Sequence, residues 1–461
     1  RFRNEDTAAY ERLSQICANR GVILLTATPF NNAPADIFAL LKLFIPPGKS
    51  TLTLDEGLAA RFAHYNSEFR KLSYILRYHA AGGEKQARAE RFYADIFESP
   101  LPINVILTQQ RVRQLAAEIR GVIEPVIIRR NRLDLKRDPV YAQELTALSE
   151  VADPVELFYE LTPAQSAFYN RVINEYFGEE GQFRGAIYQP FAYEHRRELE
   201  QLDEKGNFAY LQQRNLYEFM RRLLVKRFES SFGAFAKSMA NFRRVHSIIL
   251  AFIQKTGQYI LDRNLIEKIW EEDEETIEEE LRQFAARLAA EKNLRPHQDH
   301  VYVIEDFDEP EQFLADIRSD LELFQQIADR VEALELAVND PKSKRLVEAV
   351  REIIEAQPGS GESRRKVVIF SEYQDTVKHI APVLQAAFPE RVLVAEGSLG
   401  KGFFDDLNAN FDAGHAAERQ RDDFDILVAT DKLSEGINLN RAGAVVNYDI
   451  PWNPTRVIQR L

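Results

Sequence analysis

Hydrophobic residues follow a strand-like or a helical spacing over most of this chain, and both patterns occur near its start. Residues 21–26 (GVILLT) form a continuous apolar run, which is typical of a buried strand. Apolar side chains then recur at positions 37, 40, 41 and 44, the spacing of one helix face, and prolines 46 and 47 end that helix. Residues 51–130 have mostly helical spacing and are rich in arginine and aromatic residues. This part predicts a strand, a helix and a helical appendage.

The middle of the chain predicts a second helical block. Residues 155–161 have the pattern of a short strand, and Thr162, Pro163 and Gln165 supply an N-cap, a first-turn proline and the glutamine of a capping box. Helical spacing then continues to about residue 339. Residues 271–280 carry eight carboxylates in ten positions, which is typical of a solvated helix face.

From about residue 342, strand-like and helical patterns alternate. Apolar strand segments occupy residues 367–370, 391–395, 426–430 and 445–448. An amphipathic helix with apolar residues at 377, 380, 381 and 384 follows the first of them. Strands that alternate with helices at this spacing form a parallel sheet covered on both faces. The predicted fold class is therefore α/β.

Composition limits the class of protein. The chain has 461 residues, enough for roughly three domains, and 45% of them are hydrophobic. No apolar run reaches the roughly 18 residues needed to span a membrane, so no membrane partner is expected. Cys17 is the only cysteine, which excludes an internal disulfide and favours a cytoplasmic location. The eight histidines lack HxxxH or HxH spacing, so no metal site in the protein itself is predicted.

Seven short segments carry a family resemblance. They are RFRN at 1–4, TATPFNN at 26–32, VIIRR at 126–130, ELFYELTPAQSAFY at 156–169, VVIFSEY at 367–373, ATDKLSEGINL at 429–439, and WNP at 452–454 with QR at 459–460. Their order resembles that of the Swi/Snf-type DNA-dependent ATPases of helicase superfamily two, from just after the DEAH box through motifs III, IV, V and VI. Residues 223–235 are similar to a segment of the bacterial RapA-like branch. The chain departs from the family at Ala27, where glycine is usual, and at Lys432 and Leu433, where small residues are common.

The resemblance implies two RecA-like P-loop NTPase lobes with large α-helical insertions. Residues 1–46 would be the end of lobe one, 47–130 a first helical protrusion, 131–177 a linker with the entry strand and helix of the second half, 178–340 a second helical insertion and 341–461 lobe two. The chain would begin just after the DEAH box and stop within motif VI.

The resemblance also implies roles for single residues. Catalytic or coupling roles fall on Thr26, Thr28, Asp431, Glu435, Gly436, Gln459 and Arg460, nucleotide contacts on Gly436 and Asn438, and DNA contacts on Asn32, Ser371 and Thr430. These residue types suit the chemistry, because ATP hydrolysis needs positioned phosphates, an oriented water and cations near the developing charge. Loops at the carboxyl ends of parallel strands can hold such groups.

A local basic segment is a second candidate for DNA contact. Residues 219–246 carry seven lysines or arginines against one glutamate, inside a chain of net charge −13 that is too acidic to coat nucleic acid as a whole. Arg221, Arg222, Lys226 and Arg227 are the predicted phosphate contacts. The alternative is an amphipathic helix that packs its aromatic residues inward and extends its cations to solvent.

Together these features predict a translocase that uses ATP and Mg²⁺ to move on double-stranded DNA or to remodel DNA-bound protein complexes. No GxxxxGKS/T phosphate loop occurs, and residues 47–50 (PGKS) lack its first glycine because Leu43 stands at that position. The 461-residue chain alone is therefore expected not to hydrolyse ATP. The alternative is a non-catalytic DNA- or protein-binding scaffold derived from such a motor.

Overall fold

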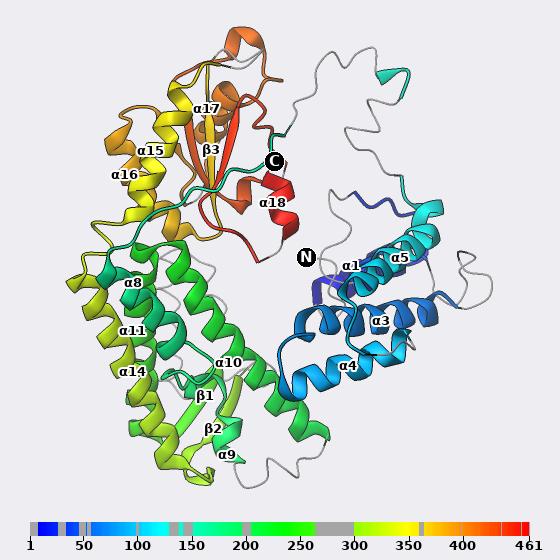
Figure 1. Cartoon of the computed structure of the whole chain (residues 1–461), viewed down its shortest axis with the longest axis vertical. Coiled ribbons are helices and arrows are strands. Elements are labelled where there is room, and N and C mark those ends of the chain that lie inside the picture. Colours follow the sequence, from blue (N-terminus) through cyan, green and yellow to red (C-terminus); the bar gives the residue numbers. More distant parts are fainter. Residues whose placement is uncertain are drawn as a thin grey trace. The chain divides into compact units, whose positions relative to one another are not determined.

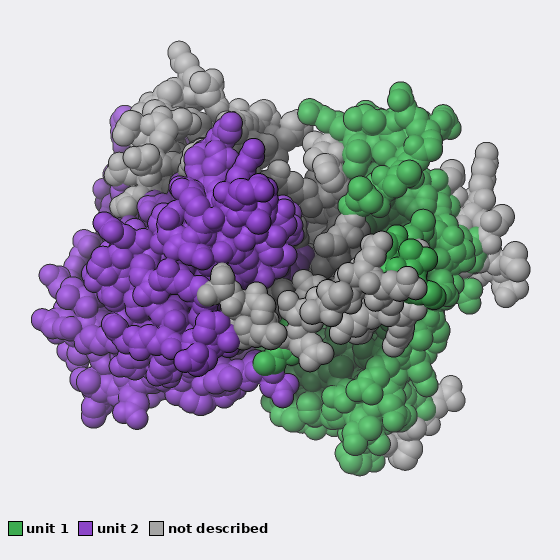
Figure 2. All heavy atoms as spheres, turned by 90° about the horizontal axis from the view of Figure 1, so that it is seen from above, with its two compact units in different colours: residues 1–152 green, residues 153–461 purple. Residues whose placement is uncertain are grey.

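A computed structural model divides the chain into two compact units, residues 1–152 and residues 153–461, which Figure 2 colours separately. The structure describes residues 8–25, 34–45, 52, 57–97, 101–128, 138–141, 151–195, 204–262, 299–358, 364–397, 399–434, 436–452 and 454–460. The acidic segment 271–280 lies outside these residues. The boundary after residue 152 falls within the segment interpreted as a linker, residues 131–177.

The first unit is helical over its described residues. It contains α1 (Ala8–Cys17), α2 (Pro34–Lys42), α3 (Leu58–Tyr78), α4 (Gly83–Phe97), α5 (Val105–Ile123) and the 3-10 turn η2 (Glu124–Val126). Helix α3 packs against α2, α4 and α5. Phe62, Leu72 and Ile119 belong to the apolar core that these helices share.

The strand predicted at residues 21–26 is not formed over residues 21–25, and residue 26 lies outside the described part. Ile23 and Leu25 are 90% and 95% exposed. An apolar run forms a strand only beside a hydrogen-bonding partner, and none of the described residues of this unit forms a strand. The helix predicted after it is confirmed as α2.

The second unit begins with a helical part. Its elements are α8 (Pro163–Asn170), the π-helical turn η3 (Arg171–Tyr176), η4 (Ala186–Tyr188), α9 (Phe191–Glu194), α10 (Glu204–Ser230), α11 (Phe232–Thr256), β1 (Gln258–Asp262), β2 (Asp299–Val303), η6 (Ile304–Asp306) and α14 (Pro310–Ala333). Helix α11 packs against both α10 and α14 (Figure 1). Buried aromatic rings, including Phe228, Phe235 and Phe324, fill the space between them.

Three predictions in this part have different outcomes. The capping box is confirmed: the Thr162 hydroxyl accepts from the Gln165 N–H at 3.3 Å, and the Gln165 side chain accepts from the Thr162 N–H at 3.0 Å. The strand predicted at 155–161 is wrong, because residues 151–162 form no strand. The helical block predicted to about residue 339 is interrupted by a strand pair, since β1 and β2 pair antiparallel with Tyr259 opposite Tyr302.

The rest of the second unit is a parallel sheet with helices. In chain order it contains α15 (Pro341–Glu355), β3 (Val367–Ser371), α16 (Gln374–Ala387), β4 (Val392–Val394), α17 (Lys401–Phe411), η7 (Ala417–Arg419), β5 (Ile426–Thr430), η8 (Asp431–Leu433), β6 (Ala444–Asn447) and α18 (Pro454–Arg460). The strands are all parallel, in the order β4-β5-β3-β6.

Both faces of this sheet are covered, as the continuous apolar strands predict. Alternate residues of β3 point to opposite faces. Val367 and Ile369 join α15 and α16 in one core, whereas Val368 and Phe370 join α17 in another. The strand segments predicted at 367–370, 391–395, 426–430 and 445–448 correspond to β3, β4, β5 and β6 within one or two residues.

Asp320 on α14 ties the helical part to the loop before η4. It is 0% exposed, and its two carboxylate oxygens accept hydrogen bonds from the backbone N–H groups of Arg184 and Gly185 at 2.7 and 2.8 Å. Burial raises the pKa of this carboxyl to about 7. A carboxylate that is half ionised near neutral pH is therefore part of the core.

We expect Asp320→Asn to lower the free energy of unfolding by about 1–3 kcal/mol at pH 5, because the protonated carboxyl keeps an oxygen at each of the two buried N–H groups, whereas the amide turns its NH₂ group, a donor, towards one of them. The raised pKa means that the folded wild type binds more protons than the unfolded chain between its ordinary value near 4 and about 7, so wild-type stability falls as pH rises through this window. The advantage of wild type over the variant should shrink from pH 5 to pH 8 in denaturant titrations. Glu322→Gln, an exposed carboxylate on the same helix, is the control, and a difference independent of pH would contradict the assignment.

Candidate functional site

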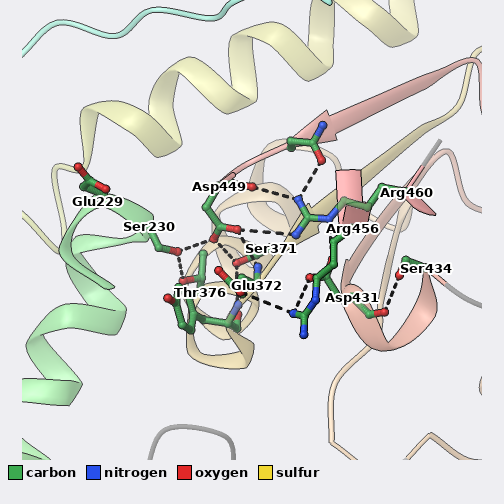
Figure 3. Close-up of polar contacts among 12 residues, drawn as sticks. Glu229, Ser230, Ser371, Glu372, Thr376, Asp431, Ser434, Asp449, Arg456 and Arg460 are labelled. Atoms are coloured by element: carbon green, nitrogen blue, oxygen red, sulfur yellow. Dashed lines mark hydrogen bonds and ion pairs between the residues drawn. The ribbon is translucent and has the colours of Figure 1, made fainter. Parts of the chain in front are cut away.

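Three parallel strands bring acidic side chains to one edge of the sheet. Ser371 at the end of β3 lies opposite Thr430 at the end of β5, and β6 ends beside β3. The residues that follow these strands include Glu372, Asp431 and Asp449. We call the polar residues at this edge the strand-end cluster: Ser371, Glu372, Asp431, Asn447, Asp449, Arg456 and Arg460 (Figure 3).

Asp449 lies at the centre of the cluster. One of its carboxylate oxygens accepts hydrogen bonds from the hydroxyls of Ser371 and Ser230, both at 2.6 Å. The other accepts from the backbone N–H of Glu372 at 2.7 Å. Because Ser230 is the last residue of α10, this single side chain joins the sheet edge to the helical part.

Two arginines of α18 hold Asp431. The Arg460 Nε atom donates to one Asp431 oxygen at 2.6 Å, and the Arg456 Nη1 atom lies 3.2 Å from the other. Arg460 also donates to the side-chain oxygen of Asn447 at 2.9 Å and to the Asp449 carbonyl at 3.0 Å. The Arg460 side chain is 0% exposed, whereas that of Arg456 is 46% exposed. Arg460 is therefore part of the framework, and Arg456 presents a cation to solvent.

Glu372 is the second carboxylate beside Arg456, with its Oε1 atom 3.6 Å from the Arg456 guanidinium. Burial raises the pKa of Glu372, and the nearby Asp449 carboxylate raises it further. Arg456 opposes this shift. The exposed arginine thus compensates the negative charge that accumulates where the strands end.

The structure places the predicted site residues unequally. Thr26, Thr28, Asn32 and Glu435 lie outside the described residues. Asp431, Arg460 and Ser371 meet in the strand-end cluster, with Thr430 at its base, while Gly436 and Asn438 are exposed in the loop after η8 and Gln459 is half-buried on α18. Gly436 has φ +76° with open space around it, so glycine is required there by its left-handed backbone.

The predicted basic track on α10 does not form one exposed surface. Arg221 is 6% exposed and donates to the Phe177 carbonyl at 3.0 Å, and Arg227 is 4% exposed and pairs with Asp375 of α16. The side chains of Arg222 and Lys226 are 52% and 35% exposed. Two of the four cations therefore stabilise the interior, because an arginine inside a protein needs acceptors for its five N–H groups.

Sequence reasoning missed Asp449, Glu372, Arg456 and Ser230 as members of the site. Asp449 and Glu372 each follow a predicted strand by one or two residues, which is the position from which Asp431 was inferred. That rule could have identified both carboxylates. Ser230 had no such signal, because only the packing of α10 against the sheet brings it there.

Comparison with known proteins bears on the same region. Residues 345–461 match the model of the family described as helicase conserved C-terminal domain. The chain is 34% identical over 100 residues to the uncharacterized ATP-dependent helicase YqhH of Bacillus subtilis, a match covering 21% of this chain and 15% of that protein. It is 28% identical over 106 residues to the ATP-dependent DNA helicase mph1 of Aspergillus terreus, covering 22% of this chain and 10% of that protein.

Residues 345–461 form a superfamily-two helicase C-terminal region. Its RecA-like α/β fold confirms the predicted fold class. The strand-end cluster lies entirely within this helicase region, and Asp449 joins it to Ser230 on α10. The matched segments span only a small part of the two helicases.

The helicase region fits part of an ATP site. Arg456 offers an exposed cation for a phosphate, and the open Gly436 loop with exposed Asn438 offers polar groups for a nucleotide.

Among the described residues no group of three His, Cys, Asp or Glu side chains could hold a metal ion. No helix of the described part is long and apolar enough to cross a membrane.

We expect Arg460→Ala and Arg456→Ala to differ sharply in stability. Removing Arg460 leaves Asp431 and Asn447 without their buried partner, which should cost about 3 kcal/mol or more and several degrees in melting temperature. Removing the half-exposed Arg456 should change the free energy of unfolding by no more than about 0.5–1 kcal/mol. Thermal unfolding measures both, with the exposed Arg419→Ala as control. Equal shifts for the two variants would contradict the division into framework and exposed cation.

Proposed function

We propose that this chain is part of an ATP-dependent translocase of the Swi/Snf helicase type, which uses Mg²⁺ and ATP in the cytoplasm to move on double-stranded DNA or to remodel proteins bound to it. The observation that carries the proposal is the strand-end cluster, in which Asp431 bridges two arginines at the carboxyl ends of parallel strands. Ligands of open α/β sheets bind at this edge. A polyphosphate placed there would meet the guanidinium of Arg456.

The cluster has the composition that phosphoryl transfer needs from one side of a cleft. A cation near the phosphates stabilises the charge that develops on their oxygens. Arg456 can serve in this way because its present partners, Asp431 and Glu372, leave half of its side chain exposed. Arg460 holds Asp431 in place and so positions Arg456 indirectly.

Translocation also needs a mechanical connection, and Asp449 supplies one. Its hydrogen bonds to Ser230 and Ser371 link the nucleotide-facing edge to the end of α10. Arg222 and Lys226 project from the last turns of that helix, and Lys226 lies 5.8 Å from the Trp452 ring of the helicase region. A shift of the strand ends would therefore move the exposed Arg222 and the partly exposed Lys226, which are the proposed DNA contacts on this helix.

The rival function is a non-catalytic scaffold that binds DNA or a protein. The ion pairs of Asp431 with Arg456 and Arg460 favour it, because they engage both cations of the strand-end cluster within the protein. The two functions differ in whether DNA stimulates phosphate release.

We expect the 461-residue chain alone not to hydrolyse ATP, because its sequence contains no GxxxxGKS/T phosphate loop. A longer protein that carries this chain together with such a loop should release phosphate, and double-stranded DNA should accelerate it. In that protein, Asp431→Ala and Arg456→Ala should each lower DNA-stimulated turnover by about tenfold, equivalent to about 1.4 kcal/mol. Arg419→Ala should not. Turnover that is absent in the longer protein, or unaffected by the two site variants, would favour the scaffold.

The DNA contacts on α10 have a separate test. Arg222→Ala with Lys226→Ala should weaken duplex binding equally for all sequences and reduce the salt slope by about one to two units, since each lost phosphate contact removes about 0.9. The matched control is Arg318→Ala with Arg330→Ala, which removes two exposed cations from α14. An unchanged slope for the first pair would assign duplex binding to other parts of the protein.

A further inference from the structure

A hollow between α3 and α4 in the first unit is not used by the proposed motor. It has two adjoining parts of about 640 and 450 Å³. Residues of both helices line it: Asn66, Arg70, Lys71 and Tyr74 from α3, and Lys85, Arg88, Arg91, Phe92 and Asp95 from α4. Volumes of this size are typical of sites that hold a small organic group.

The rim of the hollow is strongly basic. Five cations face one carboxylate, Asp95, and that carboxylate is engaged by Lys71 at 3.1 Å. Among the described residues, Arg70, Arg88 and Arg91 form no ion pair, and all three are exposed. Such a concentration of positive charge in a chain of net charge −13 indicates a polyanionic ligand.

The floor of the hollow is aromatic. Tyr74 and Phe92 meet edge to face with ring centroids 5.4 Å apart. The Arg88 guanidinium lies over both rings, 5.1 Å from the Tyr74 centroid and 5.3 Å from that of Phe92. The planar guanidinium of an arginine held beside aromatic rings offers a surface on which a nucleobase can stack.

A polar acceptor completes the wall. The side-chain oxygen of Asn66 is buried and accepts no hydrogen bond within the described chain. A buried oxygen without a donor costs free energy. An exocyclic amino group or ring N–H of a base would satisfy it, whereas a phosphate, which has only acceptor oxygens, would not.

We propose that the hollow between α3 and α4 binds single-stranded nucleic acid, with phosphates on Arg70, Lys85 and Arg91 and a base against Arg88 and its aromatic floor. Single strands present unstacked bases that can enter such a hollow. The bases of a duplex are stacked and paired, and one would have to flip out at a cost of a few kcal/mol before it could enter. A duplex would therefore meet only the basic rim.

The test compares variants of the full chain for binding to a fluorescent 20-nucleotide oligothymidine and to a duplex of equal length, without ATP, at three salt concentrations. Arg88→Ala with Arg91→Ala should weaken oligothymidine binding about tenfold or more and reduce its salt slope by about 0.7, because Arg91 is the phosphate contact of the two. Phe92→Leu, which removes the aromatic ring but keeps an apolar side chain and the charge, should weaken oligothymidine binding without changing the slope. Both effects should be smaller for the duplex.

The control is Arg113→Ala with Arg120→Ala, two exposed arginines of α5 outside the hollow, which should change neither affinity. Equal losses for oligothymidine and duplex would overturn the proposal and leave a basic rim that binds duplex. Displacement of oligothymidine by polyglutamate at equal charge concentration would also overturn it, since an acidic peptide would then fit as well. Because no ATP is used, these outcomes are independent of whether the parent protein is a motor.

Discussion

The carboxylate of Asp449 is the contact on which the arrangement of the second unit depends. It uses three hydrogen bonds to join β3, β6 and the end of α10 while only 10% of its side chain is exposed. A carboxylate in such a position is stable only when donors replace the water that it has lost. All three donors must therefore be in place together, and neither the sheet edge nor α10 can shift without breaking bonds to the other.

Two neighbouring contacts strengthen the same junction. Arg227 of α10 forms a buried ion pair with Asp375 of α16. Lys342 donates to the backbone carbonyls of Glu229 and Ser230, both at 2.8 Å, which places a cation at the negative end of the α10 dipole. Burial lowers the pKa of Lys342 to about 8, so it remains largely protonated at neutral pH. These contacts make the helical part and the helicase region a single mechanical element at this junction.

The sequence predicts what is local in this structure and misses what depends on distant partners. The strands of the parallel sheet were found because each is a short apolar run buried on both faces. The β1–β2 pair was missed because 36 residues separate the end of one strand, Asp262, from the start of the other, Asp299, and strand pairing over such a distance leaves no local signal. The strand predicted from the apolar run at residues 21–25 was wrong for the opposite reason. Its residues suit a strand, but the described part of the first unit contains no neighbouring strand with which they could pair.

The basic residues of α10 show how charge and helical phase must be read together. Arg221 has the same phase as buried Leu224 and Phe228, at i, i+3 and i+7, whereas Arg222 and Lys226 follow exposed Phe219 at i, i+3 and i+7. A count of charges predicts a track of four cations, whereas helical phase divides them into two buried framework residues and two that reach solvent, Arg222 and, in part, Lys226. The same distinction separates Arg460 from Arg456 on α18. At physiological ionic strength salt screens the interaction of exposed charges beyond about 8 Å. An anionic ligand therefore responds to the cations that reach solvent near it, Arg222, Lys226 and Arg456, and not to the net charge of the whole chain.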